Sequence, residues 1–102
     1  MRRANRVDAN QVDVVRALRE AGAFVRVINQ GEGLPDLLVG FRGKTFLMEV
    51  KDGDKMPSQR RLTDAEADFF ANWTGGPLGI VESPRDALEM LTKELDSLDG
   101  VS

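Results

Sequence analysis

The sequence has 102 residues, with 14 Lys and Arg against 17 Asp and Glu, and it contains no Cys and no His. This length fits one domain, and a composition of 41% hydrophobic and 30% charged residues fits a globular one. The absence of Cys and His excludes disulfide scaffolds, thiol catalysis, Cys and His zinc sites and His-based triads. Any catalysis must therefore depend on carboxylates, Lys, hydroxyls or a hard metal ion. With no signal-peptide pattern and no apolar run long enough to span a bilayer, we expect a cytoplasmic location.

The charges are distributed unevenly along the chain. Residues 1–61 contain 12 basic and 8 acidic side chains, whereas residues 62–102 contain 2 basic and 9 acidic ones. The first part could therefore face a polyanion, and the second part could not.

The first predicted element is a helix over residues 8–21. Gln11, Val15 and Leu18 follow a helical period, Asp8 and Gln11 resemble a capping box, and Gly22 suits the end of the helix. Three strands are then expected over residues 23–28, 35–41 and 44–51, and a polar loop over residues 52–61.

The C-terminal part begins with a second helix. Thr63 as N-cap and Glu66 three residues later form a capping box, and we expect Phe69, Phe70 and Trp73 to lie in the core. A strand over residues 78–81 precedes a last helix that opens at Ser83-Pro84. That helix has an apolar stripe that predicts packing within the chain or, alternatively, dimerisation: Leu88, Leu91, Leu95 and Leu98.

The predicted order αβββαβα indicates a single α/β domain with a mixed central sheet. We place this domain at residues 8–98, between a basic N-terminal arm at residues 1–7 and a C-terminal tail at residues 99–102.

The hairpin around Arg42-Gly43 brings two carboxylates together. A turn at these residues pairs Leu37 with Met48, which gives one apolar face and supports the register, although Arg is a poor first residue for a type I′ turn. The same register places Asp36 opposite Glu49, and Lys51 points to the same face as Glu49.

Two opposed carboxylates repel each other, and a hard divalent cation would offset this cost. Such a cation would activate a water molecule for phosphodiester hydrolysis, with Lys51 positioning the water or stabilising the developing negative charge. The alternative is a surface Lys51 that only forms ion pairs with Glu49 and Asp36 at a strand end.

These residues match a known pattern. Pro35-Asp36, twelve intervening residues and Glu49-Val50-Lys51 resemble the signature of the PD-(D/E)xK nuclease superfamily. Four strings, Asp8-Ala9-Asn10-Gln11, Pro35-Asp36-Leu37-Leu38-Val39-Gly40, Glu49-Val50-Lys51-Asp52-Gly53 and Leu62-Thr63, more closely resemble small stand-alone VRR-NUC domain nucleases of phages and bacteria. The resemblance covers residues 8–92 and implies a restriction-endonuclease-like fold, in a bacterial or phage-infected host cell.

The resemblance also implies an activity. It indicates a Mg²⁺- or Mn²⁺-dependent DNA endonuclease in which Asp36, Glu49 and the Val50 carbonyl hold the metal and Lys51 assists the attacking water. Stand-alone members resemble homodimers that act on branched DNA such as four-way junctions, in the manner of Holliday-junction resolvases.

Two positions depart from the superfamily pattern. Where many members have a Glu ligand in the first helix, this sequence has Gln11. This residue is either a neutral metal ligand or the capping partner of Asp8. Glu66 stands where relatives often have Gln near the active site, and the capping role is the favoured interpretation.

Basic residues flank the motif and predict contacts with DNA phosphates, the alternative being a solvated charged surface: Arg2, Arg3, Arg6, Lys55, Arg60 and Arg61. The favoured function is a structure-selective endonuclease working as a homodimer. The alternatives are a non-catalytic nuclease-like module that binds DNA or protein, and a duplex-specific restriction-like endonuclease.

Overall fold

The computed structural model describes residues 9–101, without the side chains of residues 59, 60 and 95–101. It contains four helices and four strands within this range: α1 (Ala9–Glu20), β1 (Phe24–Val27), β2 (Leu37–Phe41), β3 (Lys44–Val50), α2 (Pro57–Arg60), α3 (Asp64–Asn72), β4 (Leu78–Val81) and α4 (Pro84–Val101). All seven predicted elements are present. The predicted N-terminal arm, with Arg2, Arg3 and Arg6, lies outside the described residues.

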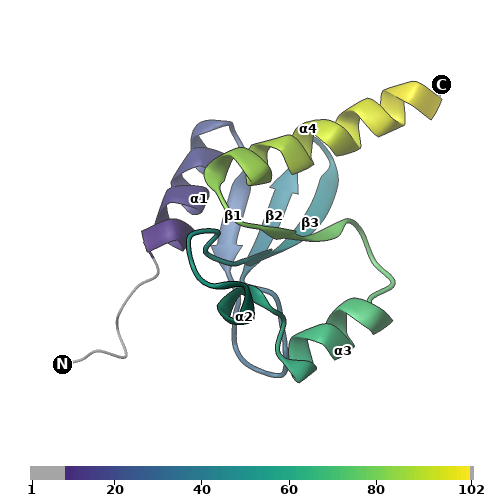
Figure 1. The fold of residues 1–102 in the computed structure, drawn as a ribbon. Helices are drawn as coiled ribbons and strands as arrows, with labels where there is room; N and C mark the ends of the chain where they lie inside the picture. Colours follow the sequence, from purple (N-terminus) through teal and green to yellow (C-terminus); the bar gives the residue numbers. More distant parts are fainter. Residues whose placement is uncertain (1–8, 102) are drawn as a thin grey trace.

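The four strands form one mixed sheet in the order β1-β2-β3-β4. β2 pairs antiparallel with both β1 and β3, and β3 pairs parallel with β4. This arrangement confirms the predicted α/β fold with a mixed central sheet (Figure 1). β3 therefore has a neighbouring strand on each side and is an interior strand of the sheet.

The predicted hairpin register is confirmed. Leu37 pairs with Met48 and Phe41 with Lys44, and the turn has positive φ angles of 50° at Arg42 and 84° at Gly43. Two such angles are the requirement of a type I′ turn, so the turn forms although Arg42 is a poor residue for it. The side chains that the register places on one face are fully buried: Leu37, Val39, Phe46 and Met48.

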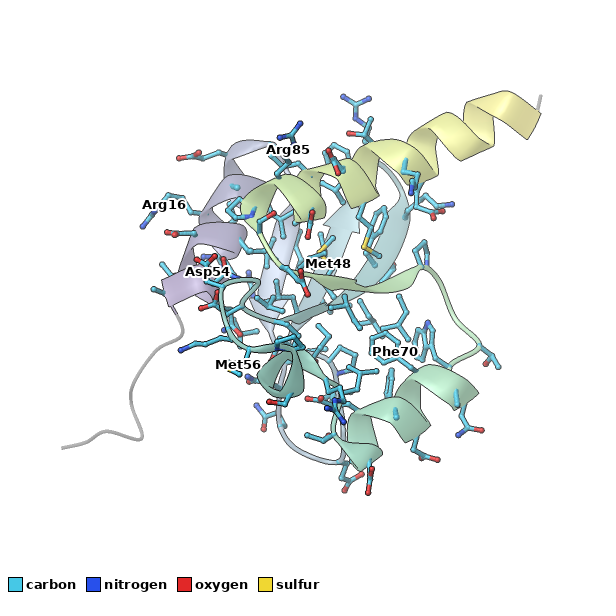
Figure 2. The ribbon with its side chains drawn as sticks, viewed as in Figure 1. Arg16, Met48, Asp54, Met56, Phe70 and Arg85 are labelled. Atoms are coloured by element: carbon cyan, nitrogen blue, oxygen red, sulfur yellow. The ribbon has the colours of Figure 1, made fainter. Side chains whose placement is uncertain are left out.

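One face of the sheet is covered by α1 and α4 (Figure 1). Val14 and Leu18 of α1 and Ala87 and Leu91 of α4 belong to the same buried cluster as Met48, which Figure 2 shows between the sheet and α4. Because Leu91 is only 2% exposed, it is unavailable for dimerisation. Leu88 and Leu91 of the predicted apolar stripe pack against the core of the chain. The side chains of Leu95 and Leu98 lie outside the described set.

The helix α3 lies on the other side of the sheet (Figure 1). Phe70 points from α3 toward the sheet (Figure 2), yet no residue of α3 is fully buried. Trp73 is 39% exposed, stacks on Phe69 with ring centroids 5.4 Å apart, and donates from Nε1 to the Gly76 carbonyl over 2.7 Å. The prediction that these aromatic residues belong to the core is therefore wrong, because every residue of α3 remains at least partly exposed.

Two further boundaries differ from the prediction. The expected polar loop over residues 52–61 contains α2, which begins at Pro57, a residue whose fixed φ suits a first helical turn. The expected C-terminal tail begins inside α4, which continues to Val101. No helix in the part of the chain that the structure describes could cross a membrane.

The approach of residues 29–34 to α3 generates the first prediction. Gly33 has a φ of 76°, and a Cβ atom at this position would collide with the Ala65 carbonyl in the first turn of α3. We expect Gly33→Ala to lower the free energy of unfolding by more than about 3 kcal/mol in urea denaturation, because it adds a backbone collision to an unfavourable φ.

The matched control is Gly31→Ala. Gly31 also has a positive φ, of 98°, but its Cβ atom would meet open space, so we expect a cost of only about 1–2 kcal/mol. Equal costs for the two variants would contradict the close approach of Gly33 to α3.

Candidate active site

The centre of the candidate site is the Glu49 carboxylate near the end of β3. Glu49 is 3% exposed, and its Oε1 atom has no hydrogen-bond partner among the described residues. Its neighbours Met48 and Val50 belong to the core. An unpartnered buried carboxylate oxygen is costly, so this atom marks a position where a ligand would be accommodated.

Asp36 lies beside this carboxylate, but not as its partner in the β ladder. The ladder between β2 and β3 ends at Leu37 and Met48, one pair before Asp36 and Glu49 would follow in the same register. The Asp36 side chain instead accepts hydrogen bonds from the Val50 backbone N–H (2.8 Å) and from Asn29 Nδ2 (3.1 Å). Asp36 is thus fixed at the end of β3, close enough for its charge to act on Glu49.

Lys51 lies on the same side of the sheet as Glu49, as its spacing predicted. Its Nζ atom lies 3.4 Å from Glu49 Oε2 and 3.0 Å from Glu66 Oε1, and its side chain is 14% exposed. The three residues of the predicted motif therefore lie together in the structure, and Glu66 is a fourth member of this cluster.

Glu66 has both of the roles that were weighed as alternatives. Its Oε1 atom accepts from the Thr63 backbone N–H (2.9 Å), while Thr63 Oγ1 accepts from the Glu66 N–H (3.1 Å), which completes the predicted capping box. The same Oε1 atom accepts from Lys51 Nζ. The capping pattern was visible in the sequence, whereas the contact with Lys51 depends on where α3 lies.

The electrostatics of the cluster follow from burial and proximity. Burial, then the charge of Asp36, then the hydrogen bond and charge of Glu66 raise the pKa of Glu49 to about 8, although Lys51 opposes this. Burial lowers the pKa of Lys51, but its contacts with Glu66 and Glu49 together hold that pKa above its ordinary value. Burial raises the pKa of Glu66, but hydrogen bonds from Thr63 and with Glu49 and Lys51 outweigh it and lower that pKa.

The first helix contributes Asn10 to this region. Asn10 Nδ2 donates to the carbonyls of Lys51 (2.9 Å) and Glu82 (3.1 Å), so it connects α1 to the chain just beyond the ends of β3 and β4. Sequence reasoning assigned no role to Asn10, because its partners are 41 and 72 residues away and no local pattern indicates them.

Gln11 lies in a groove of about 620 Å³ with Val15 of α1 and Val27 of β1. No hydrogen bond joins Gln11 to Asp36 or Glu49 within the described residues, and its role as a metal ligand stays a prediction. Its alternative role, capping with Asp8, lies outside the described residues.

The predicted DNA-contacting residues are only partly described. Lys55 and Arg61 are solvent-exposed on the segment that contains α2. The side chain of Arg60 lies outside the described set.

The fold resembles that of a solved structure described as a VRR_NUC domain. The two structures align with a TM-score of 0.54 at 24% sequence identity, over 82% of this chain and 91% of that chain. No family model and no curated protein matches the sequence. The structural similarity shows that this chain has the fold of a VRR_NUC domain, which is the fold that the sequence resemblance predicted.

The raised pKa of Glu49 generates the second prediction. Since this pKa is about 8 in the folded protein against an ordinary 4.5, the folded state binds the Glu49 proton more tightly than the unfolded chain does. In metal-free buffer the contribution of Glu49 to stability should therefore be lost as the pH rises from 4.5 through about 8. Glu49→Gln should remove this component, which we expect to be on the order of a few kcal/mol.

The measurement is urea denaturation from pH 5 to pH 9 in the presence of EDTA. A control variant, Glu20→Gln, changes an exposed carboxylate on α1 and should keep the pH dependence of the wild type. Parallel curves for the wild type and Glu49→Gln would contradict the burial of an ionisable carboxylate at this position.

Proposed function

We propose that this chain is a metal-dependent nuclease that hydrolyses phosphodiester bonds in DNA. The observation that carries the proposal is the unpartnered, buried Oε1 atom of Glu49 beside Asp36 and Lys51, at one strand end of a VRR_NUC-like fold. Fold alone does not assign chemistry, and it is this cluster that favours hydrolysis.

The donor set fits a hard divalent cation. Asp36 and Glu49 would hold the ion together with the Val50 carbonyl, and Mg²⁺ usually takes one or two carboxylates and keeps several waters. No group of three or more His, Cys, Asp or Glu side chains among the described residues is placed to hold a metal, so the other ligands in this proposal would be the Val50 carbonyl and water. Such an ion would polarise a phosphoryl oxygen and lower the pKa of a bound water.

The protein's own residues have distinct roles in this proposal. The hydrogen bonds from Val50 and Asn29 fix the orientation of the Asp36 carboxylate. Lys51, which is charged and mostly buried, orients the attacking water or stabilises the negative charge that develops on the phosphate.

For the substrate we propose branched DNA, such as a four-way junction. This choice rests on the resemblance of the sequence strings to stand-alone VRR-NUC nucleases. The exposed Lys55 and Arg61 support contact with a phosphate backbone, but they do not distinguish branched DNA from other DNA.

A non-catalytic module that binds DNA or protein is the second candidate. It is favoured by Gln11, a neutral side chain at the position where many superfamily members have a Glu ligand in the first helix. The two candidates differ in one measurable property, which is metal-dependent strand cleavage.

The third prediction tests the nuclease directly. The wild type should nick supercoiled plasmid and cut a four-way junction in Mg²⁺ or Mn²⁺, and EDTA should abolish both reactions. Asp36→Asn and Glu49→Gln should each lower cleavage by at least about a hundredfold, because each removes a charged ligand. Cleavage that persists in both variants would rule out the assigned site.

Lys51→Ala separates metal binding from chemistry. We expect this variant to lose cleavage while it retains Mn²⁺ binding in calorimetry, because Lys51 is not a ligand in the proposal. Glu20→Gln serves as a control for a change of charge on the exposed surface and should cleave like the wild type.

We further propose that the protein acts as a homodimer, since a junction requires two coordinated cuts and two-fold symmetry supplies two sites. Exposed apolar side chains gather along α1 and the edge strand β1, where Val12, Phe24 and Val27 are 40%, 54% and 46% exposed. The opposite edge is less suitable, because the acidic residues Glu89 and Glu94 lie in the groove along β4.

The fourth prediction follows from this choice of edge. Light scattering should give about twice the 11.2 kDa chain mass at micromolar concentration, and high salt should not weaken the association, because the contact is mainly apolar. Val27→Asp should shift the protein toward monomer, whereas the control Ile80→Asp on the edge strand β4 should not. A monomer in both low and high salt, with and without junction DNA, would rule out the homodimer.

A further inference from the structure

The helix α3 is attached to the rest of the molecule near its first turn. Gly33 approaches the Ala65 backbone so closely that it leaves no space for a side chain, and one residue later Glu66 contacts Lys51. No residue of α3 is fully buried, and its C-terminal end is capped by the exposed Trp73. The fixed part of this helix is thus the part that touches the candidate active site.

A single oxygen atom connects this helix start to the lysine. Glu66 Oε1 accepts from the Thr63 backbone N–H at 2.9 Å and from Lys51 Nζ at 3.0 Å. Lys51 Nζ is closer to this atom than to Glu49 Oε2, at 3.4 Å. The side chains of Lys51 and Glu66 are only 14% and 17% exposed, so water screens this ion pair weakly.

We propose that Glu66 is a positioning residue that holds the Lys51 ammonium beside the Glu49 carboxylate and directs it toward the substrate. The proposal rests on the proposed nuclease function and assigns to α3 the task of orienting Lys51.

The physical reason is the balance of charge around Lys51. With Glu49 as its only partner, the ammonium would move onto the carboxylate that is needed as a ligand. A divalent cation held by Asp36 and Glu49 would repel the ammonium, and Glu66 is the described carboxylate that offsets this repulsion. The Thr63 backbone N–H, which the variant Thr63→Ala would keep, holds the Glu66 side chain through Oε1, so the position of Glu66 does not depend on Lys51 alone.

The fifth prediction uses three variants. Glu66→Ala removes the contacts of Oε1 and should lower kcat by about ten- to a hundredfold, through misplacement of Lys51, while KM changes less than about twofold. Glu66→Gln keeps an oxygen acceptor in the same place but removes the negative charge, so its kcat should lie between those of Glu66→Ala and the wild type. Thr63→Ala removes the hydroxyl half of the capping box, costs about 0.5–2 kcal/mol of stability, and should leave kcat unchanged.

A second readout is independent of activity. In metal-free protein, the rate at which an amine-selective reagent modifies Lys51, followed by peptide mass spectrometry, should rise several-fold in Glu66→Ala and remain at the wild-type value in Thr63→Ala. The exposed Lys55 and Lys93 provide internal controls whose rates should not change.

The outcomes separate the two proposals. Equal labelling of Lys51 in the wild type and Glu66→Ala, or an equal loss of kcat in Thr63→Ala and Glu66→Ala, would overturn the positioning role while leaving the nuclease in place. A wild type that does not cleave DNA in any metal would overturn the proposed function. Labelling of Lys51 would then still report whether Glu66 holds the ammonium.

Discussion

A carboxylate that is 3% exposed within the sheet, with one oxygen that has no hydrogen-bond partner among the described residues, is the constraint around which this molecule is arranged. Transfer of an ionised group from water into such a place is unfavourable unless other charges or hydrogen bonds compensate it. Glu49 receives only part of that compensation, from Lys51, and Asp36 adds a second negative charge nearby. The fold therefore keeps a locally destabilised group inside an otherwise apolar region, which is typical of functional sites.

The topology explains how this burial arises. β3 lies between β2 and β4, and Glu49 is paired in register with Ile80 of the parallel strand β4. The main chain just after it is held from two sides, because the Lys51 N–H donates to the Val81 carbonyl (3.0 Å) and Asn10 donates to the Lys51 carbonyl. A helix and a neighbouring strand thus fix the direction in which the Lys51 side chain leaves the sheet, before Glu66 fixes its end.

The sequence predicted those parts of the site that depend on local pattern. The alternation of apolar residues determined the hairpin register, and the register placed Glu49 and Lys51 on one side of the sheet. Asn10 could not be predicted, because its contacts join a helix to two distant strand ends and depend on how the layers pack. For Gln11 the helical period defines an inward face without saying which part of the sheet this face meets, and the structure places the residue in a groove with Val27 of β1. The aromatic residues of α3 were misjudged because hydrophobicity alone does not show whether a helix packs closely.

The charges of the site also constrain the order of events in the proposed reaction. The single ammonium of Lys51 contacts Glu49 and Glu66, and Asp36 adds a third negative charge near Glu49, so a phosphate group that approaches meets more negative than positive charge. Near neutral pH the raised pKa of Glu49 reduces this excess, because its carboxyl group is largely protonated in the absence of a cation. A divalent cation at Asp36 and Glu49 would have to displace that proton, and its two positive charges would neutralise the cluster before a phosphate binds. Lys51 can then face the phosphate only if another carboxylate balances its repulsion from the cation, and Glu66 lies where that balance is required.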